Sequence, residues 1–121
     1  MRTRPDILTE IELPSGPVTI DEHGYITDPD AWSLDFADHA AAQEGIVLGP
    51  EHREIIKFLR DFLDSHGVAA DARFVLKYIS DRDNLDKSGA KDVYFGLFPK
   101  GHVKQACKIA GMKQPRAWST G

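Results

Sequence analysis

The longest amphipathic segment of the chain reads Pro50-Glu-His-Arg-Glu-Ile-Ile-Lys-Phe-Leu-Arg-Asp-Phe-Leu-Asp-Ser-His66 and is followed by Gly67. Pro50 suits the first helical position, Glu51 suits the positive end of the helix dipole, and Gly67 provides a stop. The apolar residues between these signals recur at helical spacing and form one stripe, Ile55, Ile56, Leu59, Phe62 and Leu63. We therefore predict a helix from Pro50 to about His66 that forms the spine of the fold.

Three further helices are predicted after this spine, each from apolar residues at helical spacing. The first runs from Asp71 to about Ser80, and its inner face is formed by Phe74, Val75, Tyr78 and Ile79. A short helix follows from Ala90 to Phe98. The last helix is expected from Gly101 to Ala110, with Gly111 as its C-terminal cap.

The residues before the spine predict a β-hairpin that packs against helices. Thr9–Leu13 and Val18–Ile20 have the extended pattern of strands, and the turn cluster Pro14–Pro17 joins them. Tyr25–Thr27 could add a short third strand. Two or three short strands are only marginally stable alone, so they are expected to lie against the helical part.

One more helix is predicted between the hairpin and the spine. Asp28 suits an N-cap and Pro29 the first helical position. Trp32, Phe36 and Ala40 then recur at helical spacing in a segment that ends at Glu44. Trp32 is interpreted as a core anchor, because a large aromatic residue at helical spacing is normally buried.

The composition is that of one soluble domain. The chain has 121 residues, of which 41% are hydrophobic and 28% charged. No apolar run approaches the roughly 18 residues that span a bilayer, and the N-terminus lacks the apolar region of a signal peptide. The single cysteine excludes an internal disulfide and fits a reducing compartment. A cytoplasmic protein without membrane insertion is expected.

The charge is divided unevenly between the two halves of the chain. Residues 1–70 carry fourteen acidic and five basic side chains, whereas residues 71–121 carry five acidic and ten basic ones. The basic half could meet an acidic partner or a phosphate backbone, or both surfaces are simply solvated. A pI near 5.7 does not favour nucleic acid as the partner.

No cofactor or metal site is predicted. The five histidines are scattered and pair with no cysteine or carboxylate at metal-ligand spacing. A glycine-rich phosphate loop, a nucleophile elbow and a zinc-protease motif are all missing from the sequence. No pair of carboxylates stands out as a general acid and base.

Cys107 is the candidate chemical residue, and two interpretations of it remain open. It shares one face of the last helix with Val103, Ala106 and Ala110, which is typical of a buried structural thiol. Alternatively, Lys104 and Lys108 favour its thiolate, which could then hold a persulfide or form a mixed disulfide with a partner.

A second candidate feature is the short connection Gly67–Ala70, which resembles the turn of a helix-turn-helix. A reading helix at Asp71–Ser80 would offer only Arg73 and Lys77 to DNA. The alternative is a plain corner between two helices of a bundle.

Four segments together resemble the DsrC/TusE family, which includes the gamma subunit of dissimilatory sulfite reductase. They are Asp21-Glu-His-Gly-Tyr25 with Trp32 after it, Glu51-His-Arg-Glu-Ile-Ile-Lys-Phe-Leu-Arg60, Leu97-Phe-Pro99 and Lys104-Gln-Ala-Cys-Lys-Ile-Ala-Gly111. The resemblance covers roughly residues 10–115. It implies a cytoplasmic sulfur-relay protein that passes sulfur to or from a sulfurtransferase of the TusBCD/DsrEFH type or a siroheme sulfite reductase.

Together with the residue patterns, the resemblance predicts a mainly α (α+β) fold. It is a single-domain orthogonal bundle of about five helices with an N-terminal β-hairpin and a flexible C-terminal arm. Residues 1–8 are expected to be a frayed lead, 9–27 the hairpin region, 28–111 the bundle and 112–121 the arm. The protein is expected to be a monomer that binds its partners transiently.

The chain departs from the family at the residue that carries sulfur. The resemblance places the principal carrier cysteine at the penultimate position of the arm, where ungapped counting finds Trp118; of the arm's pattern, Pro115 keeps its place. Cys107 matches the family's second cysteine, in the last helix. The residues expected to bind partners are Lys104, Lys108, Lys113, Pro115, Arg116 and Trp118.

Three hypotheses follow from this departure. The protein could carry persulfide on Cys107, or it could bind the family's partners and regulate them without carrying sulfur. The third is a DNA-binding regulator built on the corner at Gly67–Ala70. Trp118 favours the second, because an exposed tryptophan in a tail is a typical interface anchor.

Overall fold

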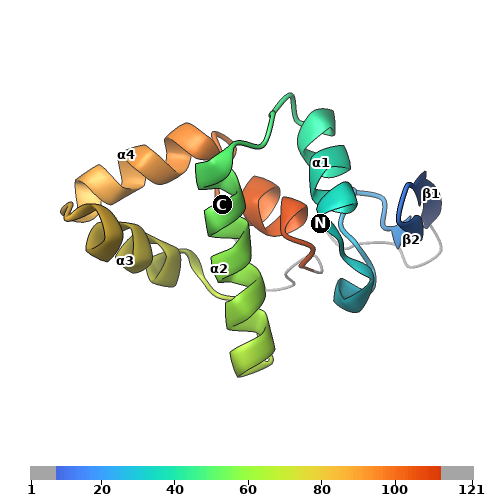
Figure 1. Cartoon of the computed structure of the whole chain (residues 1–121), viewed down its shortest axis with the longest axis horizontal. Coiled ribbons are helices and arrows are strands. Elements are labelled where there is room, and N and C mark those ends of the chain that lie inside the picture. Colours follow the sequence, from blue (N-terminus) through green and yellow to red (C-terminus); the bar gives the residue numbers. More distant parts are fainter. Residues whose placement is uncertain (1–7, 113–121) are drawn as a thin grey trace.

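The computed structural model describes residues 8–112 and has the predicted mainly α architecture with one β-hairpin. Helix α2, Pro50–His66, runs through the middle of the molecule (Figure 1). On one side of it α3 and α4 run out and back, and on the other side lie α1 and the hairpin. The last helix packs behind α2 and is the element on which the candidate site is built.

Helix α2 confirms the predicted spine at both ends. Gly67 adopts the left-handed conformation, with φ of 73°, and its N–H donates to the Leu63 carbonyl. Ile55, Ile56 and Leu59 are buried, and each contributes about 1.5–3 kcal/mol relative to an exposed side chain. The helix therefore supplies the central wall of the core.

The hairpin consists of β1, Thr9–Leu13, and β2, Gly16–Ile20, paired antiparallel with Ile11 opposite Val18. Strand β2 begins two residues earlier than predicted. The possible third strand is reduced to one isolated bridge between Ile20 and Ile26. The reason is local: the Asp21 carboxylate accepts from the backbone N–H groups of His23 and Tyr25 and so holds the chain in a turn.

The helix predicted from Asp28 to Glu44 is broken into two pieces. Asp28 caps a short 3₁₀ helix, η1, Pro29–Ala31, by accepting from the N–H of Asp30. Ser33 then caps a separate helix, α1, Leu34–Gln43, by accepting from the N–H of Phe36. Two caps five residues apart cannot serve one helix, so the chain is extended at Trp32 between them.

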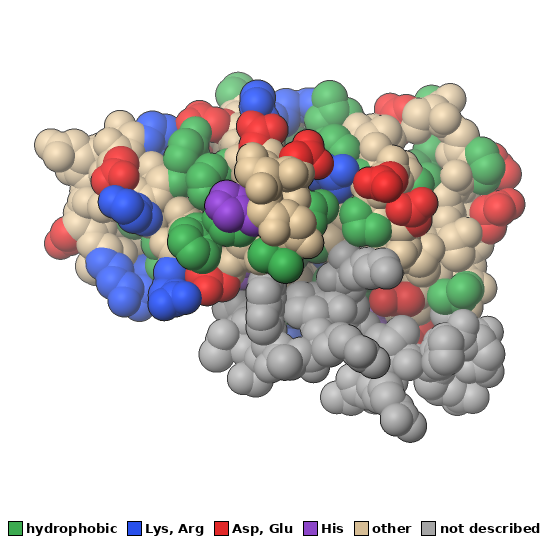
Figure 2. Space-filling view, turned by 90° about the horizontal axis from the view of Figure 1, so that it is seen from below, with side chains coloured by type: hydrophobic (Ala, Val, Ile, Leu, Met, Phe, Trp, Pro, Cys, Tyr) green, Lys and Arg blue, Asp and Glu red, His purple; other side chains and the backbone are tan. Residues whose placement is uncertain are grey.

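Helices α3, Ala72–Asp83, and α4, Lys87–Leu97, are both longer than predicted. Helix α4 begins three residues before its expected start at Ala90, because Asp86 caps it by accepting from the N–H of Gly89. The prediction that Phe74 lies on the inner face is wrong, since this side chain is 44% exposed. It contacts Phe62, and Figure 2, which looks toward the end where α2 stops, shows hydrophobic side chains gathered on this face.

The last helix differs most from its prediction. Its first part, η2, His102–Cys107, is a π-helix, and an α-helical turn continues to Ile109. Gly111, with φ of 82°, ends it as predicted. Val103, expected beside Cys107, is only half-buried, and His102 and Gln105 are buried instead. Among the helices that the structure describes, none has the length and apolar composition to cross a bilayer.

Candidate functional site

The Cys107 side chain lies inside the molecule, where it is 1% exposed. Its Sγ atom is 3.3 Å from Nε2 of His102. The π-helix accounts for this pairing, because its i→i+5 turns bring residues five apart to the same side. An α-helix would place the two residues on different sides, so the spacing gave no signal in the sequence.

The hydrogen bonds of His102 fix where its proton lies. Nε2 is 2.9 Å from the carbonyl oxygen of Ala70, which can only accept, so Nε2 carries the hydrogen. Nδ1 is then the acceptor and receives the hydroxyl proton of Tyr94 at 2.6 Å. Burial lowers the pKa of His102, which keeps the ring neutral. Its lone pair faces Tyr94, so the imidazole does not act as a base toward Cys107.

The thiol itself is held in its protonated form. Burial raises the pKa of Cys107 to about 12. Burial also raises the pKa of the neighbouring Tyr94. This corrects the expectation that Lys104 and Lys108 favour the thiolate.

Neither lysine is in a position to ionise the thiol. The Lys104 side chain is exposed. Nζ of Lys108 lies 3.7 Å from the Glu44 carboxylate and 5.2 Å from the centre of the Tyr25 ring. Glu44 also accepts from the side-chain amide of Gln105 at 3.1 Å. Lys108 is therefore engaged with α1 and the hairpin, at the edge of a cleft of about 470 Å³ that both elements line.

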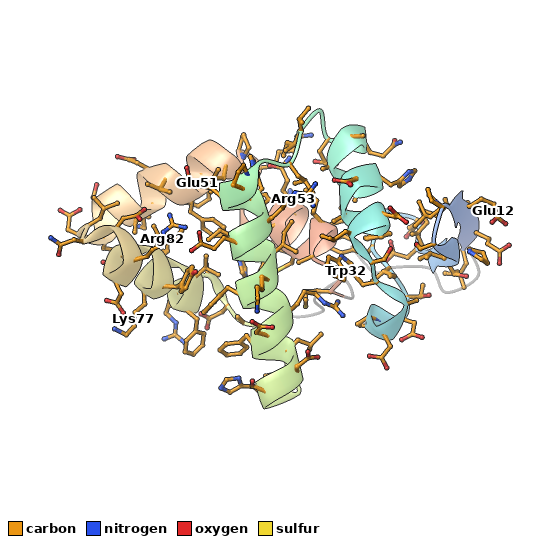
Figure 3. All side chains as sticks on the ribbon, viewed as in Figure 1. Glu12, Trp32, Glu51, Arg53, Lys77 and Arg82 are labelled. Carbon is orange, nitrogen blue, oxygen red and sulfur yellow. The ribbon has the colours of Figure 1, made fainter. Side chains whose placement is uncertain are left out.

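The end of the last helix is bonded to two side chains from other elements. The indole N–H of Trp32 donates to the Ile109 carbonyl at 3.0 Å. Arg60, on α2, donates to the carbonyls of Ala110 and Gly111 at 3.2 and 3.4 Å. The guanidinium carbon also lies 4.6 Å from the centre of the Trp32 ring, in cation–π contact. Figure 3 labels Trp32 beside α2.

The structure describes only part of the set of site residues that the sequence predicted. Of the predicted set, Cys107, Lys104 and Lys108 lie in the described helix, whereas Lys113, Pro115, Arg116 and Trp118 lie outside the described residues. Met112, assigned to the arm from the sequence, is a core residue at 2% exposure. Sequence reasoning missed the roles of His102, Tyr94 and Arg60, because each depends on a contact between distant elements.

Within residues 8–112, no three metal-ligating side chains come together.

The chain is similar to proteins of sulfur metabolism. A family profile described as DsrC like protein matches residues 13–117. The sulfurtransferase TusE of Pectobacterium atrosepticum is 35% identical over 105 residues, which cover 87% of this chain and 95% of the relative. TusE of Escherichia coli K12 is 37% identical over 98 residues, or 81% and 89%.

Solved structures give the same relationship. The NMR structure of Allochromatium vinosum DsrC matches with a TM-score of 0.79 and 30% identity, over 93% of this chain and 99% of that one. The oxidized gamma-subunit of the dissimilatory sulfite reductase (DsrC) from Archaeoglobus fulgidus matches with a TM-score of 0.77 and 30% identity, over 91% and 99%.

Proposed function

The chain belongs to the family of DsrC-like proteins, and from this premise we propose that it acts in sulfur relay as a member that binds partners but carries no sulfur. Its partner is a sulfurtransferase complex of the TusBCD/DsrEFH type or a siroheme sulfite reductase. The names of its relatives, sulfurtransferase TusE and the gamma-subunit of dissimilatory sulfite reductase, support this choice.

One observation carries the proposal: the single thiol of the chain is closed. Cys107 is the only cysteine in the sequence. To accept sulfur, its thiolate would attack the outer sulfur of a donor persulfide, forming a new S–S bond while the donor leaves as a thiolate. With a pKa of about 12, roughly one thiol in 10⁵ is ionised at pH 7. The buried Sγ is also out of reach of a donor protein.

The binding role falls to the C-terminal arm and the adjoining helix surface. Arg116 and Trp118 are of the residue types that are enriched where proteins bind one another, and Lys113 adds a second positive charge to the arm. Lys104, on the last helix, is exposed and offers a further positive charge to the partner.

Intact-mass measurement tests whether the protein carries sulfur. The wild type is incubated with a persulfide-loaded sulfurtransferase, and Cys107→Ser serves as the control. We expect neither protein to gain the mass of a sulfur atom. A sulfur adduct on the wild type that is missing from Cys107→Ser would overturn the proposal and assign persulfide carriage to Cys107.

Titration with a purified TusBCD-type complex tests the binding role. We expect Cys107→Ser to bind as the wild type does, and a chain that lacks residues 113–121 to bind more weakly. Met112 is kept because it belongs to the core. Equal affinity with and without residues 113–121 would contradict the role of the arm.

A further inference from the structure

The C-terminal end of the last helix leaves backbone carbonyls without a hydrogen-bond donor inside the helix. The N–H of Met112 donates to the Cys107 carbonyl at 3.0 Å, and that of Gly111 donates to the Lys108 carbonyl at 3.2 Å. With Gly111 in the left-handed conformation, these two bonds make a Schellman end. The carbonyls of residues 109–111 remain for partners elsewhere in the fold.

Trp32 and Arg60 bond those three carbonyls. The indole N–H donates to the carbonyl of residue 109, and one guanidinium nitrogen donates to those of residues 110 and 111. The second guanidinium nitrogen donates to the carbonyl of Pro29 at 3.0 Å, so Arg60 joins the helix end to η1. A cation at this place is also favoured by the negative end of the helix dipole.

The packing at the same point leaves no room for adjustment. A Cβ atom on residue 111 would lie 2.2 Å from Cδ1 of Trp32, so only glycine fits beneath the indole ring. The Met112 side chain, the next along the chain, is buried. The backbone is therefore fixed by tertiary contacts up to the residue before the arm.

We propose that Arg60 and Trp32 are positioning residues for partner binding, because they fix the backbone of residues 109–111, just before the point where residues 113–121 are joined to the described domain. This role rests on the proposed function of the arm. A chain segment that starts from a fixed root loses less conformational entropy when its tip binds. Removing the two side chains should weaken partner binding although neither has to touch the partner.

A double-mutant cycle with the full-length protein and the purified TusBCD-type complex tests this role. Arg60→Met keeps the apolar stem of the side chain and removes its donors. It is measured in the full chain and in the chain without residues 113–121. Arg53→Met is the matched control, because Arg53 lies two turns earlier on α2 (Figure 3) and, among residues 8–112, its side chain makes one exposed ion pair, with Asp38.

We expect Arg60→Met to lower the affinity of the full chain roughly tenfold, the effect of re-ordering one or two backbone residues on binding. In the truncated chain it should have no further effect. Arg53→Met should match the wild type in both. Amide hydrogen exchange at Gly111 and Met112 should be faster in Arg60→Met and unchanged in Arg53→Met.

The outcomes separate the two proposals. If truncation leaves binding unchanged, the proposed function of the arm is wrong, and the positioning role falls with it. If truncation weakens binding but Arg60→Met does not, or weakens both chains equally, only the positioning role is wrong. Trp32→Phe, which keeps an aromatic side chain but loses the indole N–H donor and the second ring, repeats the cycle should Arg60→Met fail to fold. Trp32→Phe should lower the affinity for the complex in the full chain and not in the truncated chain. Any other pattern contradicts the positioning role.

Discussion

The protonated state of Cys107 has a measurable consequence for stability against pH. Its pKa is about 12 in the folded protein, against an ordinary value of 9.0 for the free thiol. The folded state favours the protonated thiol. The contribution of this thiol to the free energy of unfolding is therefore fully present below about pH 9 and is lost as the pH rises toward 12. Over that interval the unfolded chain releases the Cys107 proton and the folded chain keeps it.

The size of the effect follows from these two pKa values. Between pH 8 and pH 10 the unfolded-state term RT ln(1 + 10^(pH − pKa)) grows by about 1 kcal/mol, taking the unfolded pKa as 9.0. The folded-state term stays close to zero because its pKa is far higher. Cys107 alone should therefore lower the free energy of unfolding by about 1 kcal/mol over two pH units.

Urea unfolding at a series of pH values, on the wild type and on Cys107→Ala, measures this contribution. Lysines and tyrosines titrate in the same range, but they are common to both proteins, so the difference between the two curves isolates the thiol. Lys104→Ala, at an exposed position, should run parallel to the wild type. Parallel curves for the wild type and Cys107→Ala between pH 8 and 10 would refute a closed thiol.

Three further predictions concern the stability of the scaffold, each measured by urea unfolding. Gly111→Ala should destabilise the fold by more than about 2 kcal/mol, because φ is 82° and the new Cβ would meet Trp32 at 2.2 Å. Gly96→Ala, in open space on α4, is the control for Gly111→Ala and should be neutral or stabilising by about 0.5–1 kcal/mol. A similar loss of stability at both glycines would contradict the packing argument.

Tyr94→Phe should cost about 1–3 kcal/mol, because the buried imidazole loses the hydroxyl that donates to it; no loss would mean that this bond is not made. Ser33→Ala should cost about 1 kcal/mol through the lost cap of α1, and an unchanged stability would indicate that α1 begins elsewhere.

The elements that the sequence predicted well are those with local signals at both ends. Helix α2 has proline at its start, glycine at its end and an unbroken apolar stripe, and its observed bounds agree with the prediction. The break at Trp32 also had a local signal, since Ser33 is a favoured N-cap. The helical spacing of Trp32, Phe36 and Ala40 predicted one continuous helix, which included Ser33 as an interior residue.

For the candidate site, the sequence singled out Cys107 and its two lysines, but neither the protonation state of the thiol nor the neighbouring His102 and Tyr94. The lysines around Cys107 suggested an ionised thiol, because one-dimensional spacing shows which charges are near in the chain. This spacing does not show that Tyr94 and the Ala70 carbonyl hydrogen-bond to the two ring nitrogens of His102. Nor does it show that a π-helix brings His102 close to the sulfur. Burial of the thiol is a tertiary property, and it determines the pKa.

The closed thiol and the fixed root of the arm depend on the same short helix. The Cys107 sulfur contacts His102, at the start of this helix, and the carbonyls bonded by Trp32 and Arg60 lie two to four residues after Cys107. A displacement of this helix as a unit that exposed the sulfur would also break the bonds at its end. Accepting sulfur by that route would thus also release the backbone of residues 109–111. The proposed positioning role and sulfur transfer to Cys107 therefore make opposite demands on the same helix.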